Sequence, residues 1–175
     1  VYTLPKNLTY YGQDNGSIDG DGAGTYYSYE LIQDAIALAD PDVNFQNFDI
    51  VQVLHSGVGQ ESSGVASDIW SVRFYNINIS TNDGVTITSA TIVPQEEVGG
   101  LSALGVVVHE LGHDIGNLPD LYDVKTTPTS DGIGKWGLMG SGNWNGNGHN
   151  PSHFSAWSKI KMGWITPTEV TSNTM

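Results

Sequence analysis

Two histidines separated by four positions lie inside the strongest helical pattern of the chain, in the segment His109-Glu110-Leu111-Gly112-His113. Apolar residues recur there at spacings of three and four, at Leu101, Leu104, Val108, Leu111 and Ile115. This spacing predicts an amphipathic α-helix over residues 101–115, and Gly116 offers a natural helix end. Positions i and i+4 lie one turn apart on one helix face, so His109 and His113 can converge on a single metal ion.

The apolar stripe predicts how this helix is oriented. We expect it to hold the helix against the core and to aim the histidines into a cleft. Glu110 lies about 100° round the helix from His109, so it is placed to reach a metal-bound water as a general base and not to bind the metal. The alternative is a surface helix with scattered histidines, and the amphipathic setting favours the metal site.

A catalytic zinc usually has three protein ligands, so a third is needed beyond His109 and His113. Gly116 allows the chain to turn sharply after the helix, and Asp120 can then return toward the metal. Asp123 is the reserve choice. The alternative for Asp120 is a carboxylate that caps a turn.

The remaining pattern predicts an α+β domain with a mixed sheet. A helix is expected over Tyr26–Ala39, because Leu31, Ala35 and Leu38 recur at helical spacing. Strands are expected over 49–54, 70–79, 85–87 and 90–93, the last two joined by a short turn. A long loop over 117–150 precedes a last helix over 151–162, with Asn150 as its cap and Gly163 as its stop.

The amino-acid composition limits the kinds of molecule that the chain can bind. The 175 residues suggest one domain, and 19 acidic against 6 basic side chains give a formal net charge of −13. Such a surface repels phosphate backbones and anionic lipid, which argues against nucleic acid and membranes as partners. It suits a soluble protein outside the cell. The absence of cysteine excludes disulfides and a thiolate zinc site.

A calcium site is also considered in the Gly- and Asp-rich segment 12–24. Asp19, Asp21, Gly24 and Glu30 fall at positions of an EF-hand loop, but Ala23 replaces a ligand and no helix precedes it. A looser Ca²⁺ site using Asp14, Asp19 or Asp21 stays open beside the simpler interpretation of a solvated turn.

Four tryptophans cluster late in the chain, and we expect them to pack in the core and between subdomains: Trp136, Trp144, Trp157 and Trp164. The rival interpretation is a surface that stacks on carbohydrate.

Four segments resemble the immune inhibitor A family of metallopeptidases. The run HELGHDIGNLPDLYD (109–123) is similar to its extended zinc motif, and DGIGKWGLMGSGNWNG (131–146) to its Met-turn region. The segments HSGVGQESSGVASDIWSVRF (55–74) and NPSHFSAWSKIKMGWITP (150–167) are similar as well, so the resemblance runs from about Tyr10 to Pro167. The family is metzincin-like, with aspartate in place of a third histidine.

The resemblance implies a zincin fold in one catalytic domain over 1–175: a twisted sheet and active-site helix (about 1–116) above a smaller C-terminal subdomain (about 117–175). It implies His109, His113 and Asp120 as zinc ligands, Glu110 as base and Met139 beneath the metal. One feature departs from the family pattern, since the aspartate stands seven residues after the second histidine, not six. Pro119 occupies the sixth position, and Asn117 looks like a one-residue insertion.

The sequence therefore predicts a secreted, monomeric zinc endopeptidase that hydrolyses proteins or peptides. The alternative is a non-catalytic binding module on a zincin scaffold, with glycan as its ligand.

Overall fold

The computed structural model describes residues 1–14, 26–125 and 127–171. Its first half holds the helices α1 (Leu8–Tyr11), α2 (Tyr26–Ala39) and α3 (Gln60–Ser63), the strands β1 (Gln52–Val58), β2 (Val72–Ser80) and β3 (Thr86–Glu96), and the short 3₁₀ turns η1 (Phe45–Asn47) and η2 (Val98–Gly100). Helix α4 (Leu104–Gly116) follows, and then the turns η3 (Gly134–Trp136) and η4 (Ser141–Trp144) and helix α5 (Ala156–Lys161).

The sheet has the order β1-β3-β2 in the described part of the chain. Strand β1 runs parallel to β3, and β2 runs antiparallel to it, which confirms the predicted mixed sheet. The prediction of two short strands over 85–87 and 90–93 was wrong, because β3 is one continuous strand. It pairs with a neighbour on each side, and the pairing of Ser89 with Tyr75 of β2 keeps the segment between the two predicted strands extended.

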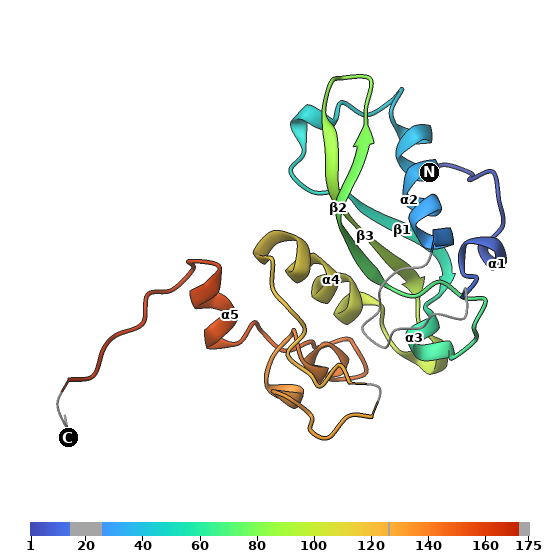
Figure 1. Cartoon of the computed structure of the whole chain (residues 1–175). Helices are drawn as coiled ribbons and strands as arrows, with labels where there is room; N and C mark the ends of the chain where they lie inside the picture. The colour runs from blue at the N-terminus through green and yellow to red at the C-terminus, as the bar shows by residue number, and fades with distance from the viewer. Residues whose placement is uncertain (15–25, 126, 172–175) are drawn as a thin grey trace.

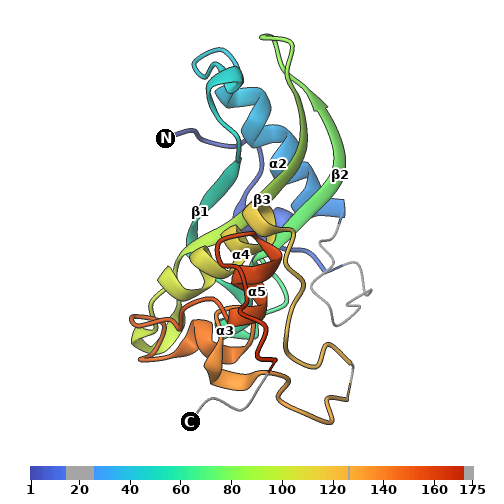
Figure 2. The same cartoon turned by 90° about the vertical axis from the view of Figure 1, so that its left-hand side faces the viewer.

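Helices α2 and α4 cover opposite faces of the sheet (Figure 1). On one face Ala90 and Ile92 of β3 pack into a core with Leu31, Ile32 and Ile36 of α2. Alternate strand residues point the other way, and there Ser89 donates a hydrogen bond to Asp114 of α4. The layers therefore run α2, sheet, α4, and α5 lies beyond α4 (Figure 2).

The predicted role of the apolar stripe on α4 was wrong. Leu104 is 48% exposed and Ile115 is 43% exposed, whereas Gly105, His109 and Gly112 are buried. Val106 and Glu110 are buried as well, so the buried part of α4 is not the predicted stripe, and the C-terminal half packs against the glycine and histidine positions. A Cβ atom on Gly105 would lie 1.9 Å from the carbonyl oxygen of Asn143, so only glycine permits this approach.

The ends of α4 and α5 also differ from the prediction. Gly116 is the last helical residue of α4, and Asn117 takes the left-handed conformation that ends it, with φ 43° and ψ 44°. Helix α5 begins at Ala156, not at 151, because Ser155 is its cap and accepts a hydrogen bond from the backbone N–H of Ser158.

Three of the four late tryptophans are exposed, which corrects the prediction that they pack in the core. Trp136 is 91% exposed, and Trp157 and Trp164 are about half exposed. Only part of Trp164 is covered, by an edge-on contact with Phe154.

The close approach to α4 predicts the effect of a substitution. We expect Gly105→Ala to lower the free energy of unfolding by about 1–3 kcal/mol, because the methyl group forces the backbone at Asn143 away. Alanine alone would favour the helix by about 1 kcal/mol, so the sign of the change is informative. Leu104→Ala, at an exposed neighbouring position, is the control. A thermal midpoint that rises in Gly105→Ala would contradict the packing.

Candidate metal centre

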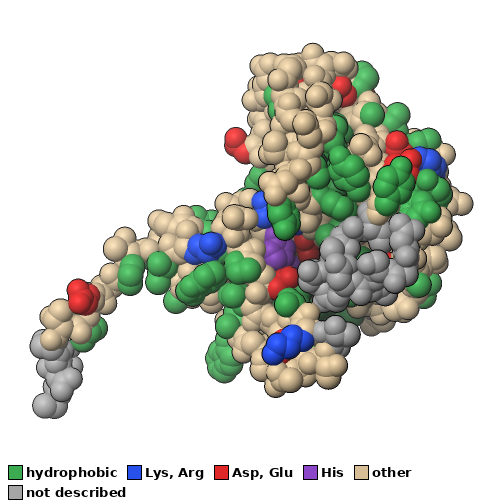
Figure 3. All heavy atoms as spheres, viewed as in Figure 1, with side chains coloured by type: hydrophobic (Ala, Val, Ile, Leu, Met, Phe, Trp, Pro, Cys, Tyr) green, Lys and Arg blue, Asp and Glu red, His purple; other side chains and the backbone are tan. Residues whose placement is uncertain are grey.

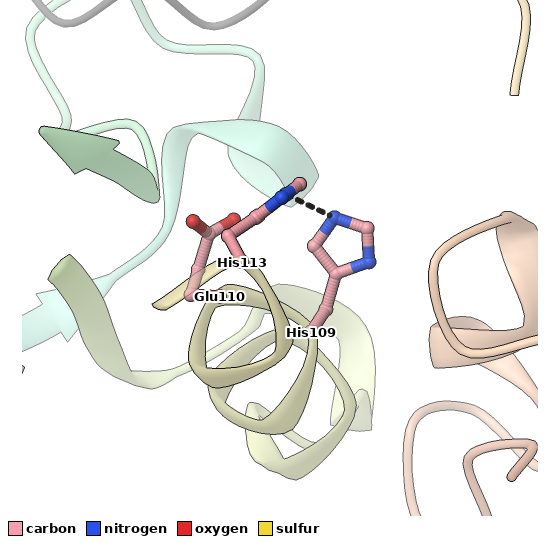
Figure 4. A group of neighbouring side chains, drawn as sticks. All are labelled: His109, Glu110 and His113. Atoms are coloured by element: carbon pink, nitrogen blue, oxygen red, sulfur yellow. Dashed lines mark hydrogen bonds between the residues drawn. The ribbon is translucent and has the colours of Figure 1, made fainter. Parts of the chain in front are cut away.

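Helix α4 projects His109, Glu110 and His113 to one side (Figure 4). Within the described residues these three form a group whose candidate ligand atoms all lie within 4.8 Å of one another. His109 and Glu110 are buried, and His113 is partly buried. Figure 3 shows a histidine side chain beside acidic side chains near the middle of this face of the molecule.

Asp120 completes a triangle of possible ligand atoms with the two histidines. Its Oδ1 lies 3.0 Å from Nε2 of His109 and 3.3 Å from Nε2 of His113. The two Nε2 atoms lie 3.1 Å apart. Ligand atoms of a tetrahedral zinc ion, at about 2.0–2.1 Å from the metal, are separated by about 3.3 Å. The triangle therefore has the size that a zinc ion requires.

Backbone carbonyls set the tautomer of both histidines. Nδ1 of His109 lies 2.9 Å from the carbonyl oxygen of Leu138, and Nδ1 of His113 lies 2.7 Å from that of Leu118. Carbonyl oxygens only accept hydrogen bonds, so each Nδ1 carries the proton and donates it. In the neutral rings both Nε2 lone pairs then face the triangle, an arrangement typical of metal-binding histidines.

Burial and charge set the protonation of the two carboxyl groups differently. Burial raises the pKa of Glu110 to about 7, and this effect outweighs the charges of His109 and His113, which lower the pKa; the charges of Asp120 and Glu61 raise it further. Burial also raises the pKa of Asp120, but the hydrogen bonds that His109 and His113 donate from Nε2 in their charged form outweigh it and hold this pKa below its ordinary value. Asp120 is thus an ionised group, as a ligand must be, and Glu110 can exchange a proton near neutral pH.

The two candidate aspartates differ in position. The left-handed residue Asn117 turns the chain back, and Asp120 reaches the histidines despite the extra residue in the segment. Asp123 instead accepts hydrogen bonds from the backbone of Lys125 and Thr129, so its carboxylate holds the following loop.

Met139 is fully buried below the histidine helix. A Cβ atom on Gly112 would lie 2.7 Å from its sulfur, so the side chain fits against α4 because Gly112 has no side chain. The backbone of the same segment supplies the Leu138 carbonyl to His109. The ring of Tyr122 lies nearly parallel to that of His109, with 6.3 Å between ring centroids and 23° between the ring planes.

The family comparison adds an independent finding. The sequence model of the immune inhibitor A peptidase M6 catalytic domain matches residues 48–165. The chain belongs to the immune inhibitor A family of peptidases. This match confirms the resemblance noted in the sequence, and it includes the whole of α4 and the candidate metal centre.

Three curated relatives of this immune inhibitor A family member are similar along nearly all of it. Pre-pro-metalloprotease PrtV of Vibrio cholerae serotype O1 is 29% identical over 98% of the chain, in strain M66-2 and in strain ATCC 39315 alike. Immune inhibitor A of Bacillus thuringiensis subsp. alesti is 28% identical over 90% of the chain. The chain spans 23% of the length of the first two relatives and 28% of the third.

A second pair of acidic side chains lies near the candidate centre and was not found from the sequence. Glu97 is 6% exposed and accepts a hydrogen bond from Ser62, while Glu61 accepts hydrogen bonds from Ser71. Burial raises the pKa of Glu97 to about 7, the bond from Ser62 lowers it, and the charge of Glu61 raises it.

This raised pKa predicts a stability that depends on pH. A carboxyl group whose pKa is higher in the folded state destabilises the fold when ionised, so the cost grows from about pH 4.5 to pH 7 and is constant above. We expect Glu97→Gln to stabilise the fold by about 1 kcal/mol at pH 8 and to have little effect at pH 4.5. Urea unfolding at both pH values measures this difference.

The control is Glu96→Gln, at the exposed neighbouring position. A gain from Glu97→Gln that is equal at the two pH values would contradict the assignment of the ionisation to Glu97.

Proposed function

We propose that the chain is the catalytic domain of a secreted zinc endopeptidase that hydrolyses protein or peptide substrates. The observation that carries the proposal is the convergence of His109, His113 and Asp120 on a triangle of zinc dimensions, with Glu110 beside it. The family supports a peptidase, and the donor set supports zinc, since two imidazoles and a carboxylate suit this ion. No cysteine is present to offer another kind of site.

Each residue has a distinct role in the proposed mechanism. His109, His113 and Asp120 would hold the ion, and a bound zinc ion would supply Lewis-acid chemistry for the activation of water and of a peptide carbonyl. Glu110 takes a proton from the attacking water and delivers it to the leaving amine. The Leu138 and Leu118 carbonyls keep the two imidazoles in the ligating tautomer.

The proposed fold is zincin-like, in a single domain over 1–175. Residues 1–116 form the upper part, with the sheet and α4, and 117–175 form the lower part. We propose that the segment around Met139 is the Met-turn. The buried side chain of Met139 lies against Gly112, and Gly112 stands between the two histidines in the sequence. It supports the site by packing and makes no bond to zinc.

The proposed location and partners of the protein follow from its charge and from its family. A net charge of −13 suits an extracellular protein and disfavours nucleic acid, and no helix in the described residues is long and apolar enough to cross a membrane. We propose a monomer. The possible Ca²⁺ site stays a prediction, because Asp19 and Asp21 lie outside the described residues, while Asp14 accepts a hydrogen bond from Gln60.

A second candidate function is a non-catalytic module that binds glycan. The exposure of Trp136, Trp157 and Trp164 favours it, because flat aromatic surfaces stack on sugar rings. The presence of Glu110 beside the histidines favours the enzyme, since a binding module has no use for a base. Glycan-array binding without hydrolysis of casein would support the module over the enzyme.

The role of Glu110 predicts a loss of turnover without loss of metal. We expect Glu110→Gln to lower kcat on casein or a peptide by about 10²–10⁴-fold, because the amide cannot take a proton. Zinc content, measured by atomic absorption on the same sample, should stay near one ion per chain. Equal turnover in the variant and the parent protein would contradict the mechanism.

The third ligand predicts a contrast between two aspartates. We expect Asp120→Ala to weaken zinc binding by about 100-fold or more, because one of three ligands is removed. Asp123→Ala should leave zinc affinity nearly unchanged, because its carboxylate holds the loop through Thr129. Competition with a chromophoric chelator measures both affinities. The reverse order would assign the ligand to Asp123.

A further inference from the structure

Arg73 of β2 links the sheet to the end of the histidine helix. Its Nε donates hydrogen bonds to Ser89 Oγ at 3.0 Å and to Asp114 Oδ1 at 3.2 Å. Its Nη1 donates to the side-chain oxygen of Asn117 at 3.0 Å. One guanidinium group thus contacts the central strand, the last turn of α4 and the residue that ends α4.

This contact is largely buried. The side chain of Arg73 is 17% exposed and that of Asp114 is 5% exposed. Ser89 also donates a hydrogen bond to Asp114, while the second carboxylate oxygen, Oδ2, has no hydrogen-bond partner among the described residues. The positive charge of Arg73 is therefore the main compensation for a carboxylate that has lost most of its water.

The segment that Arg73 holds leads directly into the candidate centre. Asn117 has the left-handed conformation that turns the chain, the next carbonyl, of Leu118, orients His113, and Asp120 follows two residues later. Asn117 is also the residue that looks inserted relative to the family pattern. An added residue between His113 and Asp120 would shift the aspartate unless the turn absorbs it, and the turn is where Arg73 binds.

We propose that Arg73 is a positioning residue for the metal ligand Asp120. Its guanidinium group fixes Asp114 and Asn117 together, so that the turn through Asn117 absorbs the extra residue and returns Asp120 to the two histidines. The inference rests on the proposed function, in which Asp120 binds zinc. Arg73 touches neither the proposed ligand atoms nor the base, so it acts through the turn.

The test measures the metal site and not only turnover. Zinc affinity is obtained by chelator competition, and Co²⁺ substitution gives a visible absorption spectrum that reports ligand geometry. Asn117→Gly removes the acceptor for Arg73 while glycine still permits the left-handed conformation. Because Asn117 is exposed, this variant is expected to fold.

A second variant separates positioning from stability. Arg73→Gln alone leaves Asp114 buried without its counter-charge, whereas Arg73→Gln/Asp114→Asn removes both charges and is expected to melt near the parent protein. Arg73→Lys keeps the charge but cannot hold Asp114 and Asn117 through a planar fork, so it should rescue zinc affinity only in part. The control is Lys125→Gln, which removes an exposed charge next to Asp123 on the far side of the same segment.

We expect Asn117→Gly and the double variant to weaken zinc binding by about 10- to 100-fold and to change the Co²⁺ spectrum, while Lys125→Gln changes neither. Parental zinc affinity and an unchanged Co²⁺ spectrum in Asn117→Gly would overturn the inference, and so would the same result in the double variant. If the parent protein binds no zinc, or if Asp120→Ala binds it normally, the proposed function fails first. If both of those behave as proposed and only the Arg73 and Asn117 variants are normal, only this inference fails.

Discussion

The close contact between α4 and the C-terminal half determines the candidate centre. Gly105, Gly112 and Gly116 share a helix face with His109, and added Cβ atoms there would strike Asn143, Met139 and Met162 respectively. Because these positions have no side chains, the backbone after Asp120 comes close enough for the Leu138 carbonyl to reach His109. The histidine orientation is thus a product of helix packing, and a side chain on this face would separate the two halves of the site.

Charge imposes a second constraint on the same region. Glu110, Asp120 and Asp114 are acidic groups with low exposure in a protein that already carries a net charge of −13. Ionised carboxylates lose solvation on burial and need compensation from cations or hydrogen-bond donors. Arg73 supplies it for Asp114, whereas Asp120 lies beside the imidazoles of His109 and His113. A divalent ion in the triangle would compensate the charge of Asp120 and leave both rings neutral. The types of ligand and the charge balance of the site therefore both favour a divalent metal ion.

The sequence predicted those parts of the molecule that local periodicity determines. The range Tyr26–Ala39 of α2 was predicted as observed, and the pairing of His109 with His113 on one helix face follows from the helical repeat alone. The stripe from Leu104 to Ile115 was predicted to pack in the core, but both of these residues are exposed. An apolar face favours burial without determining which surface will cover it. The sequence cannot show that another segment will pack against the glycine face instead. The continuity of β3 was missed for a similar reason, since its pairing depends on β1 and β2, which are distant in sequence.

The position of the third ligand shows why motif spacing is a weaker constraint than geometry. Counting residues from His113 places Pro119 where the family pattern has an aspartate, and by that count the site lacks its third ligand. In the structure Asn117 takes a left-handed backbone conformation, which costs less free energy for asparagine than for most residues. The chain then turns back, so that Asp120 lies close to both Nε2 atoms. The side chain that makes this conformation accessible is also the acceptor for Arg73, which comes from a strand 44 residues earlier in the chain. A local insertion is therefore accommodated by a nonlocal contact, and neither the turn nor its support can be inferred from the motif that they complete.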